Sequence, residues 1–313
     1  MSNYLITGAN AGIGWSACGQ LALREDTAKV YLACRSSFKA QAAIQKLVSD
    51  YGCPQAKLEY IHFDASETKK EIESITKALD GILLNGLVLN AGGPGNDASE
   101  EPTGPNGVMN IVQINIIGHM QLVQALQSKH ILAEGCRIIY SGSESARGIP
   151  MFFQKAPQLG ESVDFFEKFM KGRSGKTRDI SFMYAATKGL ATLYFAAYAR
   201  RNPAYKVLTV SPGGTLGTNA LQSKSIPWYG KIIVKLLWLV AYYLSRFQVL
   251  EQGAKKYVDA VTGDCDMYPS GTFLACSVDL AGPLCDQAAF PGGLQYSDVK
   301  KQEAAYEALQ RYL

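Results

Sequence analysis

Tyr184 and Lys188 are the two residues of this sequence whose types and spacing best suit proton transfer. They lie four positions apart in the segment 183–188, so on a helix they share one face. A free phenol has a pKa of about 10, and a neighbouring cation stabilises the phenolate and lowers that pKa. We therefore expect Tyr184 to act as an acid or base near neutral pH. The spacing alone is weak evidence, because both residue types are common on solvated helix faces.

A glycine-rich turn near the start of the chain supplies context for this pair. Residues 3–6 predict a short apolar strand and residues 15–24 predict a helix. Glycines between a strand and a helix permit a tight turn and let backbone N–H groups approach a pyrophosphate. The turn therefore predicts dinucleotide binding. The expected contacts are Gly8, Asn10, Gly12, Ile13 and Gly14.

The end of the next predicted strand, residues 29–34, indicates which dinucleotide binds. NAD-binding chains usually carry an acidic residue about twenty positions after the glycine turn, whereas here Arg35 follows the strand. A guanidinium can pair with a 2′-phosphate through its planar fork, and Ser36 and Lys39 are further donors. We therefore expect NADP rather than NAD. An exposed arginine without a ligand is the alternative.

The composition is typical of an enzyme without a metal or disulfide framework. The chain has 313 residues, 47% of them hydrophobic and 19% charged, with a formal net charge of +4. That weak positive balance gives little support to nucleic-acid binding. Seven cysteines lack a Cys-x-x-Cys pair and only three histidines occur. The first predicted strand begins near residue 3, which leaves no room for a leader, so we expect a cytoplasmic protein.

Apolar strand and helix patterns alternate along the whole chain. Further strands are predicted over 58–63, 87–92, 137–141 and 206–210, with helices between them. Such alternation predicts an α/β fold, a doubly wound parallel sheet with helices on both faces. We expect one domain over residues 1–313, with the motifs at the carboxyl ends of the strands.

The order of these motifs resembles the short-chain dehydrogenase/reductase family, and the resemblance covers nearly the whole chain. The layout is most similar to the carbonyl reductase, retinol dehydrogenase and light-dependent protochlorophyllide reductase branches. The motifs are Thr7-Gly8 through Gly12-Ile13-Gly14, Asp64, Asn90-Ala91-Gly92, Asn115, Ser143, Tyr184 with Lys188, and Pro212-Gly213.

The resemblance implies four catalytic residues. Tyr184 would protonate a carbonyl oxygen, and Lys188 would lower its pKa and hold the nicotinamide ribose. Ser143 would donate a hydrogen bond to the substrate oxygen. Asn115 would support a water-linked proton path to Lys188. The remaining residues implied to contact the cofactor are Asp64 at the adenine, Asn90, Ala91 and Gly92 in the cleft, and Pro212, Gly213, Thr215 and Thr218 over the nicotinamide.

Two segments depart from the common pattern of that family. Ser143 and Tyr184 are separated by more residues than usual, so we expect an insertion over about 150–181 with an amphipathic helix at 161–170. Packed beside the catalytic helix, it would obstruct the usual dimer face and favour a monomer or weak dimer. The second segment is an apolar lid over about 215–250 that follows Pro212-Gly213.

The lid contains an aromatic and basic stretch at 226–247. Its charged residues leave too short an apolar run to span a membrane. An apolar wall for the substrate is the first interpretation, and shallow docking on a membrane surface is the second.

These observations predict an NADP(H)-dependent oxidoreductase. It would transfer a hydride between nicotinamide and a carbonyl, alcohol or activated double bond of an apolar substrate, which is its expected small-molecule partner. One alternative is a double-bond reductase similar to protochlorophyllide reductase. Another is a non-catalytic NADP(H)-binding regulator that contacts a protein partner.

Overall fold

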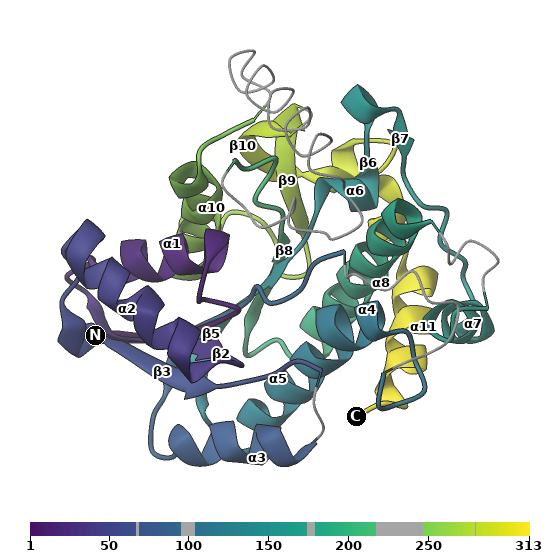
Figure 1. Ribbon diagram of the computed structural model, residues 1–313. Helices are drawn as coiled ribbons and strands as arrows, with labels where there is room; N and C mark the ends of the chain where they lie inside the picture. Colours follow the sequence, from purple (N-terminus) through teal and green to yellow (C-terminus); the bar gives the residue numbers. More distant parts are fainter. Residues whose placement is uncertain (67–68, 95–103, 174–178, 217–246, 279) are drawn as a thin grey trace.

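A central eight-stranded sheet organises the molecule in the computed structural model (Figure 1). Its strand order is β10-β9-β8-β5-β4-β1-β2-β3, and every neighbouring pair is parallel except β9 with β10. The strands are β1 (Ser2–Thr7), β2 (Thr27–Cys34), β3 (Leu58–His62), β4 (Leu84–Leu89), β5 (Leu132–Ser141), β8 (Lys206–Val210), β9 (Phe273–Val278) and β10 (Ala281–Asp286). The structure describes residues 1–66, 69–94, 104–173, 179–216, 247–278 and 280–313.

The strand order reverses between β1 and β4, which pair directly. Chain segments leave these two strands toward opposite halves of the sheet, so their carboxyl ends border a crevice. The glycine turn follows β1 and the Asn90-Ala91-Gly92 motif follows β4. The expected cofactor motifs therefore meet at the place where such a sheet binds ligands.

Helices cover both faces of the sheet, and each face has its own apolar core. One face carries α1 (Gly12–Ala22), α2 (Ser37–Tyr51) and α10 (Leu250–Thr262). The other carries α3 (Lys69–Ala78), α5 (Gly118–Ser128) and α8 (Ile180–Arg201). This arrangement confirms the predicted doubly wound α/β fold.

The segment between β5 and α8 is longer than a simple crossover needs. It contains α6 (Glu144–Arg147), a two-stranded hairpin of β6 (Gly148–Ile149) and β7 (Gln154–Lys155), and α7 (Val163–Met170). Phe166, Phe169 and Met170 of α7 are buried, because its apolar stripe faces the core. The predicted insertion and its amphipathic helix are confirmed.

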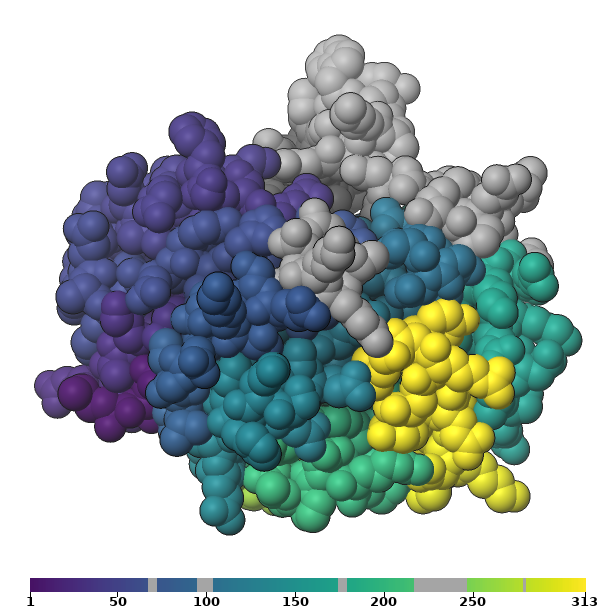
Figure 2. All heavy atoms as spheres, turned by 90° about the horizontal axis from the view of Figure 1, so that it is seen from below, coloured from purple at the N-terminus to yellow at the C-terminus, as the bar shows by residue number. Residues whose placement is uncertain are grey.

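The C-terminal helix α11 (Val299–Gln310) packs along α8, and α7 packs against α11. Figure 2 shows the yellow C-terminal residues on the surface beside teal residues of the chain's middle part. We expected the insertion to pack beside the catalytic helix, and the sequence also predicts a terminal helix over residues 302–313. In the structure that terminal helix, α11, supplies much of the cover of α8. α8 is apolar all round, and a helix of that kind must be buried on its outer face as well as against the sheet.

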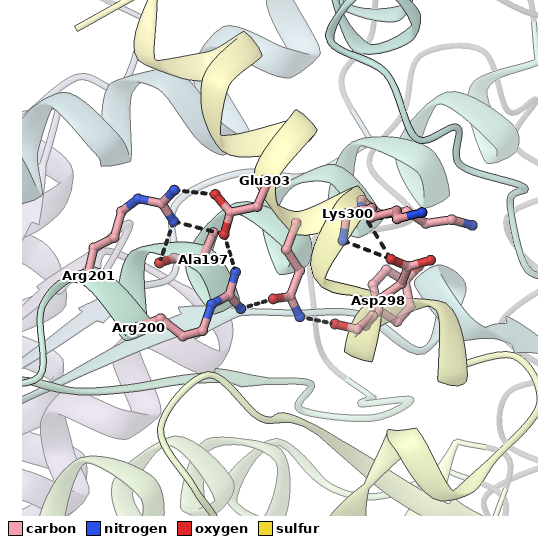
Figure 3. A network of polar contacts seen from close by, with 9 residues as sticks. Ala197, Arg200, Arg201, Asp298, Lys300 and Glu303 are labelled. Atoms are coloured by element: carbon pink, nitrogen blue, oxygen red, sulfur yellow. Dashed lines mark hydrogen bonds and ion pairs between the residues drawn. The ribbon is translucent and has the colours of Figure 1, made fainter.

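Polar contacts join α8 to α11 at one end (Figure 3). Glu303 accepts hydrogen bonds from both Arg200 and Arg201, the first at 2.6 Å. The Arg201 guanidinium carbon also lies 4.1 Å from the ring centre of Tyr306. These contacts fix the register of the two helices, and stacking of Tyr306 on Tyr194 continues the interface inward.

Some sequence predictions differ from the structure at the C-terminal edge of the sheet. The sequence of residues 270–274 resembles a final strand, but the strand begins at Phe273, because Gly271 has a φ of +92° and makes a turn before it. The antiparallel edge strand β10 was not predicted. Most of the lid, residues 217–246, lies outside the described residues. Among the helices that the structure describes, none is long and apolar enough to cross a membrane.

Candidate active site

Tyr184 and Lys188 lie one turn apart in α8, as their spacing predicts. Lys188 is 2% exposed, and its Nζ donates a hydrogen bond of 2.8 Å to the carbonyl oxygen of Ser141. Ser141 is the last residue of strand β5, so the sheet fixes the position of the Lys188 ammonium. The Nζ atom also lies 5.0 Å from the ring centre of Tyr140 and 5.7 Å from that of Tyr184.

Ser143 reaches Tyr184 from the loop after β5. Its hydroxyl lies close enough to the phenol to act on it, in the direction that lowers the pKa of Tyr184. Ser143 is also the N-cap of α6, and its Oγ accepts from the N–H of Ser145 at 3.2 Å. The cap fixes the hydroxyl beside the phenol. The structure thus brings Ser143, Tyr184 and Lys188 together although the insertion separates them in sequence.

The pKa values of the pair differ from our expectation. We expected Lys188 to lower the pKa of Tyr184, but burial raises it to about 12, and the charge of Glu144 adds to that direction. Burial also lowers the pKa of Lys188 to about 7. The prediction counted the attraction between the two groups and neglected the cost of removing both charged forms from water. In this structure Tyr184 therefore keeps its proton at neutral pH.

Asn115 lies in a π-helical turn, residues Gln113–Ile117, that joins the short helix α4 (Asn110–Val112) to α5. Its Nδ2 donates to the carbonyl oxygens of Gly93 and Ile111, and its Oδ1 accepts from the N–H of Gly93 at 3.0 Å. The Asn115 side chain therefore holds the loop at Gly93 against this helical turn. Single π turns inside helices are frequent at functional sites because they release a backbone carbonyl.

The backbone carbonyl oxygen of Asn115 makes two side-chain contacts. The hydroxyl of Tyr140 donates to it at 3.1 Å, and Nδ1 of His119 lies 3.3 Å away. Nε2 of His119 lies 3.1 Å from Oγ1 of Thr7. Burial, followed by the charge of Lys188, lowers the pKa of His119 to about 3. A neutral imidazole therefore connects Asn115 to the strand that leads into the glycine turn.

The glycine turn and the Asn90-Ala91-Gly92 motif form one interlocked unit. The amide of Asn90 donates to the carbonyl oxygen of Thr7 at 2.9 Å, and the N–H of Ala91 donates to Oγ1 of Thr7 at 2.9 Å. Any Cβ at Gly8, whose φ is +66°, would lie 2.8 Å from Cα of Ala91. A Cβ at Gly14 would lie 2.5 Å from Nδ2 of Asn90. Glycine is required where the two loops meet.

The start of α1 suits a pyrophosphate. Its N-cap, Ala11, makes no side-chain capping bond, and no acidic residue occupies the first turn. The first backbone N–H groups and the helix dipole can therefore be satisfied by an anion. Asn10 and Ile13 are partly exposed beside them, and a Cβ at Gly12 would meet nothing within 4 Å. These residues fit a dinucleotide.

The residues expected at the adenosine end also lie at strand ends. Arg35 is exposed directly after β2, while Ser36 caps α2 by accepting from the N–H of Lys39 at 3.3 Å. Asp64 follows β3, and its Oδ1 accepts from the N–H and the hydroxyl of Ser66 at 2.9 and 2.7 Å. Ser36 and Asp64 thus have local structural partners, and Arg35 and Lys39 are exposed.

The Pro212-Gly213 turn follows β8. The carbonyl oxygen of Pro212 accepts from the amide of Gln248 and from Nζ of Lys256, the latter at 3.4 Å. Gly213 has a φ of +83°. Thr215 is 5% exposed, and its Oγ1 donates to the carbonyl oxygen of Gly213 at 3.2 Å. Thr218 lies outside the described residues.

Sequence reasoning missed four residues around this site: Tyr140, His119, Glu144 and Lys256. Tyr140 and His119 contact the Asn115 carbonyl, Glu144 follows Ser143 directly, and Lys256 contacts Pro212. None of the four carried a signal in the sequence, because their contacts depend on how the fold brings separate segments together.

Comparisons with known proteins agree with the fold and the motifs. A family model described as short chain dehydrogenase matches residues 2–154. The human WW domain-containing oxidoreductase is 30% identical over 145 residues, which are 46% of this chain and 33% of that protein. The chain thus spans about a third of the length of the first curated relatives that it matches.

Two further proteins match over a larger share of the chain. The rat 3-keto-steroid reductase/17-beta-hydroxysteroid dehydrogenase 7 is 22% identical over 275 residues, covering 78% of this chain and 76% of that protein. The L-sorbose reductase of Gluconobacter frateurii, solved with NADPH and L-sorbose, has a TM-score of 0.61 at 17% identity, covering 87% and 93% of the two chains. The second likeness concerns the fold alone.

Sheet order, interlocked loops and these matches define the class of protein. The chain belongs to the short-chain dehydrogenase/reductase family of oxidoreductases.

Proposed function

We propose that this chain is an NADP(H)-dependent reductase of carbonyl groups on apolar substrates, able to run in reverse with the corresponding alcohol. The observation that carries the proposal is the placement of the Ser143 and Tyr184 hydroxyl groups near each other beside the buried Lys188. Two hydroxyl groups converge there, and one belongs to a residue that can release a proton. Titratable groups with strongly shifted pKa values, such as this buried ammonium, cluster at functional sites.

In this proposal the chain's own residues move the proton and stabilise charge. Tyr184 donates its phenolic proton to the carbonyl oxygen of the substrate. Ser143 donates a hydrogen bond to the same oxygen as negative charge develops on it. Lys188 contributes its charge from a fixed position, because Ser141 holds its Nζ. When bound, the nicotinamide supplies or accepts the hydride.

The raised pKa of Tyr184 favours the reductive direction at neutral pH. A phenol with a pKa of about 12 is protonated at pH 7 and is ready to act as an acid. Oxidation of an alcohol needs the phenolate, which burial disfavours. The protonated phenol is therefore the form that suits the acid role in reduction.

The choice of NADP rests on the end of β2. Arg35 is exposed there, and the sequence places no carboxylate at that position for the ribose hydroxyls. A guanidinium in this place can form a charge-assisted, bidentate pair with a 2′-phosphate. That pair is stronger than its hydrogen bond to a neutral 2′-hydroxyl. The sorbose reductase with a similar fold was solved with NADPH.

A small apolar cluster near the Pro212-Gly213 turn supports an apolar substrate. Ile149, Phe247 and Leu280 are buried together, with Met151 and Leu216 packed against them. This cluster joins the hairpin of the insertion to both ends of the lid segment. Its apolar side chains lie near the Pro212-Gly213 turn, since a Cβ at Gly214 would lie 2.8 Å from Cβ of Leu280.

The proposal is tested by combining NADPH binding with turnover on the same purified chain. Protein-to-NADPH fluorescence transfer measures binding, and loss of NADPH absorbance measures turnover with steroid ketones, quinones, diketones and aliphatic ketones. We expect binding together with reduction of at least one apolar class. Binding of NADPH without consumption across the panel would overturn the enzymatic proposal and favour a non-catalytic NADP(H)-binding protein.

A further inference from the structure

A buried carboxylate, that of Glu144, lies next in the chain to the proposed hydroxyl donor Ser143. Glu144 follows Ser143 and is only 4% exposed. Its Oε2 accepts from the hydroxyl of Ser211, and its Oε1 accepts from the N–H of Cys276 at 3.4 Å. Burying an ionised carboxylate costs several kcal/mol unless hydrogen bonds and charges compensate. Such a group is retained in a core only when it has a defined set of partners.

A second buried charged side chain, on α10, contacts the same residue of β9. Lys256 is 8% exposed, and its Nζ lies 2.9 Å from Sγ of Cys276 and 3.4 Å from the carbonyl oxygen of Pro212. Burial raises the pKa of Cys276 to about 12, so the thiol stays neutral between the carboxylate and the ammonium. Glu144 and Lys256 therefore contact the same residue of β9, the first at its backbone N–H and the second at its Sγ.

These contacts stabilise the short helix α6, which would not be stable alone. α6 contains only Glu144–Arg147, and so short a helix has no independent stability in water. Glu144 at its start bonds the N–H of Cys276, and Arg147 at its end donates to the carbonyl oxygen of Cys276 at 3.3 Å. The helix is fastened to one residue of β9 at both ends. Ser143, its N-cap, takes its position from that attachment.

The same carboxylate also reaches the turn that borders the nicotinamide site. Ser211, which donates to Glu144, directly precedes Pro212 and lies 3.5 Å from the N–H of Gly213. A Cβ at Gly213 would lie 2.8 Å from Sγ of Cys276, so the turn packs on the same thiol. One buried side chain thus touches both loops that the proposed reaction needs.

We propose that Glu144 is a positioning residue that fixes the Ser143 hydroxyl relative to the Pro212-Gly213 turn. It acts through Ser211 and Cys276 and touches neither substrate nor cofactor. This inference rests on the proposed reductase function and adds a residue to it. A misplacement of about 1 Å at a reacting group can lower a rate roughly a hundredfold, so losing this connection should affect turnover more than binding.

The kinetic test compares Glu144→Gln with Glu134→Gln in the full chain. Glu134 is an exposed carboxylate on the same strand, β5, that leads to Ser143. With NADPH and benzil, or the best substrate of the panel, we expect Glu144→Gln to lower kcat roughly tenfold or more. The KM for substrate and the Kd for NADPH should change less than about threefold. Glu134→Gln should match the wild type, and equal kinetics for both variants would overturn the proposal.

A double-mutant cycle with Ser143→Ala identifies the route of the effect. If Glu144 acts by placing the Ser143 hydroxyl, Glu144→Gln should cost less than about twofold once that hydroxyl is absent. A full additional loss in the Ser143→Ala background would show that Glu144 acts elsewhere and would overturn the proposal. If Glu144→Gln alone fails to fold, the pair Glu144→Gln with Lys256→Met removes both buried charges together and replaces it in the cycle.

Hydrogen–deuterium exchange keeps this inference separate from the proposed function. In Glu144→Gln we expect faster exchange in residues 141–147 and 211–216 together, whereas Glu134→Gln should leave both unchanged. A wild-type chain that reduces nothing would overturn the reductase function, and the exchange result would still test the connection between the two loops. Unchanged exchange in both segments would overturn the connection itself.

Discussion

The ammonium nitrogen of Lys188 lies 5.7 Å from the centre of the Tyr184 ring, and the carbonyl oxygen of Ser141 holds it there. A cation at this distance from an aromatic face is attracted to it, while burial opposes its charge. Each of the two side chains therefore lies in the environment of the other. We expect replacement of Tyr184 and replacement of Lys188 to have different effects.

Tyr184→Phe should abolish most turnover and leave cofactor binding nearly intact. The substitution removes the proton donor and little packing, and general acid catalysis is typically worth about 10²- to 10⁴-fold. Steady-state kinetics and an NADPH fluorescence titration measure the two effects. Tyr194→Phe is the matched control, because Tyr194 is a buried tyrosine of the same helix that stacks on Tyr306. Full activity of Tyr184→Phe would remove Tyr184 from the proposed mechanism.

Lys188 should make the stability of the wild type depend on pH between about 7 and 10. Its pKa is lowered from 10.5 to about 7, so the unfolded chain binds a proton in this window that the folded chain does not. Stability attributable to this group therefore rises with pH, by up to about 1.4 kcal/mol per unit. Below pH 7 the penalty of burying the charge is fully present.

Lys188→Met tests this linkage because methionine has a similar shape and no charge. We expect the variant to be more stable than the wild type at pH 7, with the difference shrinking toward pH 10, and to lose activity. Urea unfolding at pH 7, 8 and 9 measures the difference. Parallel pH dependence of the two proteins would contradict the lowered pKa.

The elements that the sequence predicted are those encoded locally. The strand at residues 206–210 and the helix around Tyr184 follow from apolar runs and spacing, and both were found. β10 contains Gly282 and Pro283, which locally favour a turn, so only its pairing with β9 makes it a strand.

The site was predictable as a set of residues and only in part as an arrangement. Neighbours along the chain indicated the helical pair and the glycine turn. The contacts of Glu144 with Ser211 and Cys276 join residues far apart in sequence, and no local pattern encodes them. The pKa values of Tyr184 and Lys188 depend on how deeply the fold buries them, which spacing cannot reveal.

Arg35→Ala should weaken NADPH far more than NADH. The guanidinium is exposed at the end of β2 and is proposed to meet the 2′-phosphate, which NADH lacks. Hydrogen bonds to charged groups contribute about 1.5–3 kcal/mol, equivalent to roughly ten- to a hundredfold in Kd. Arg24→Ala is the control, since Arg24 is a surface arginine paired with Asp26. Equal weakening of both cofactors by Arg35→Ala would contradict the assignment to NADP.

Glu303→Gln should destabilise the chain modestly at neutral pH. Hydrogen bonds and charge from Arg201 and Arg200 lower the pKa of Glu303 to about 2. The stabilisation is therefore present above the ordinary pKa of a glutamate and is lost as the pH falls toward 2. Because these side chains are about one third exposed, we expect about 1 kcal/mol at most.

Thermal or urea unfolding at pH 7 and pH 3 measures this contribution. Glu307→Gln is the matched control, an exposed carboxylate one turn further along the same helix. A difference between Glu303→Gln and the wild type that persists unchanged at pH 3 would contradict the ion-pair explanation.

The full chain should be a monomer or at most a weak dimer, because α11 already covers the outer face of α8. Size-exclusion chromatography with light scattering should give a mass near 34.0 kDa. Ending the chain after Asp298 would remove α11 and expose the apolar surface around Tyr194, so that variant should self-associate or precipitate. A stable tetramer of the full chain would show that α11 does not prevent assembly through other faces.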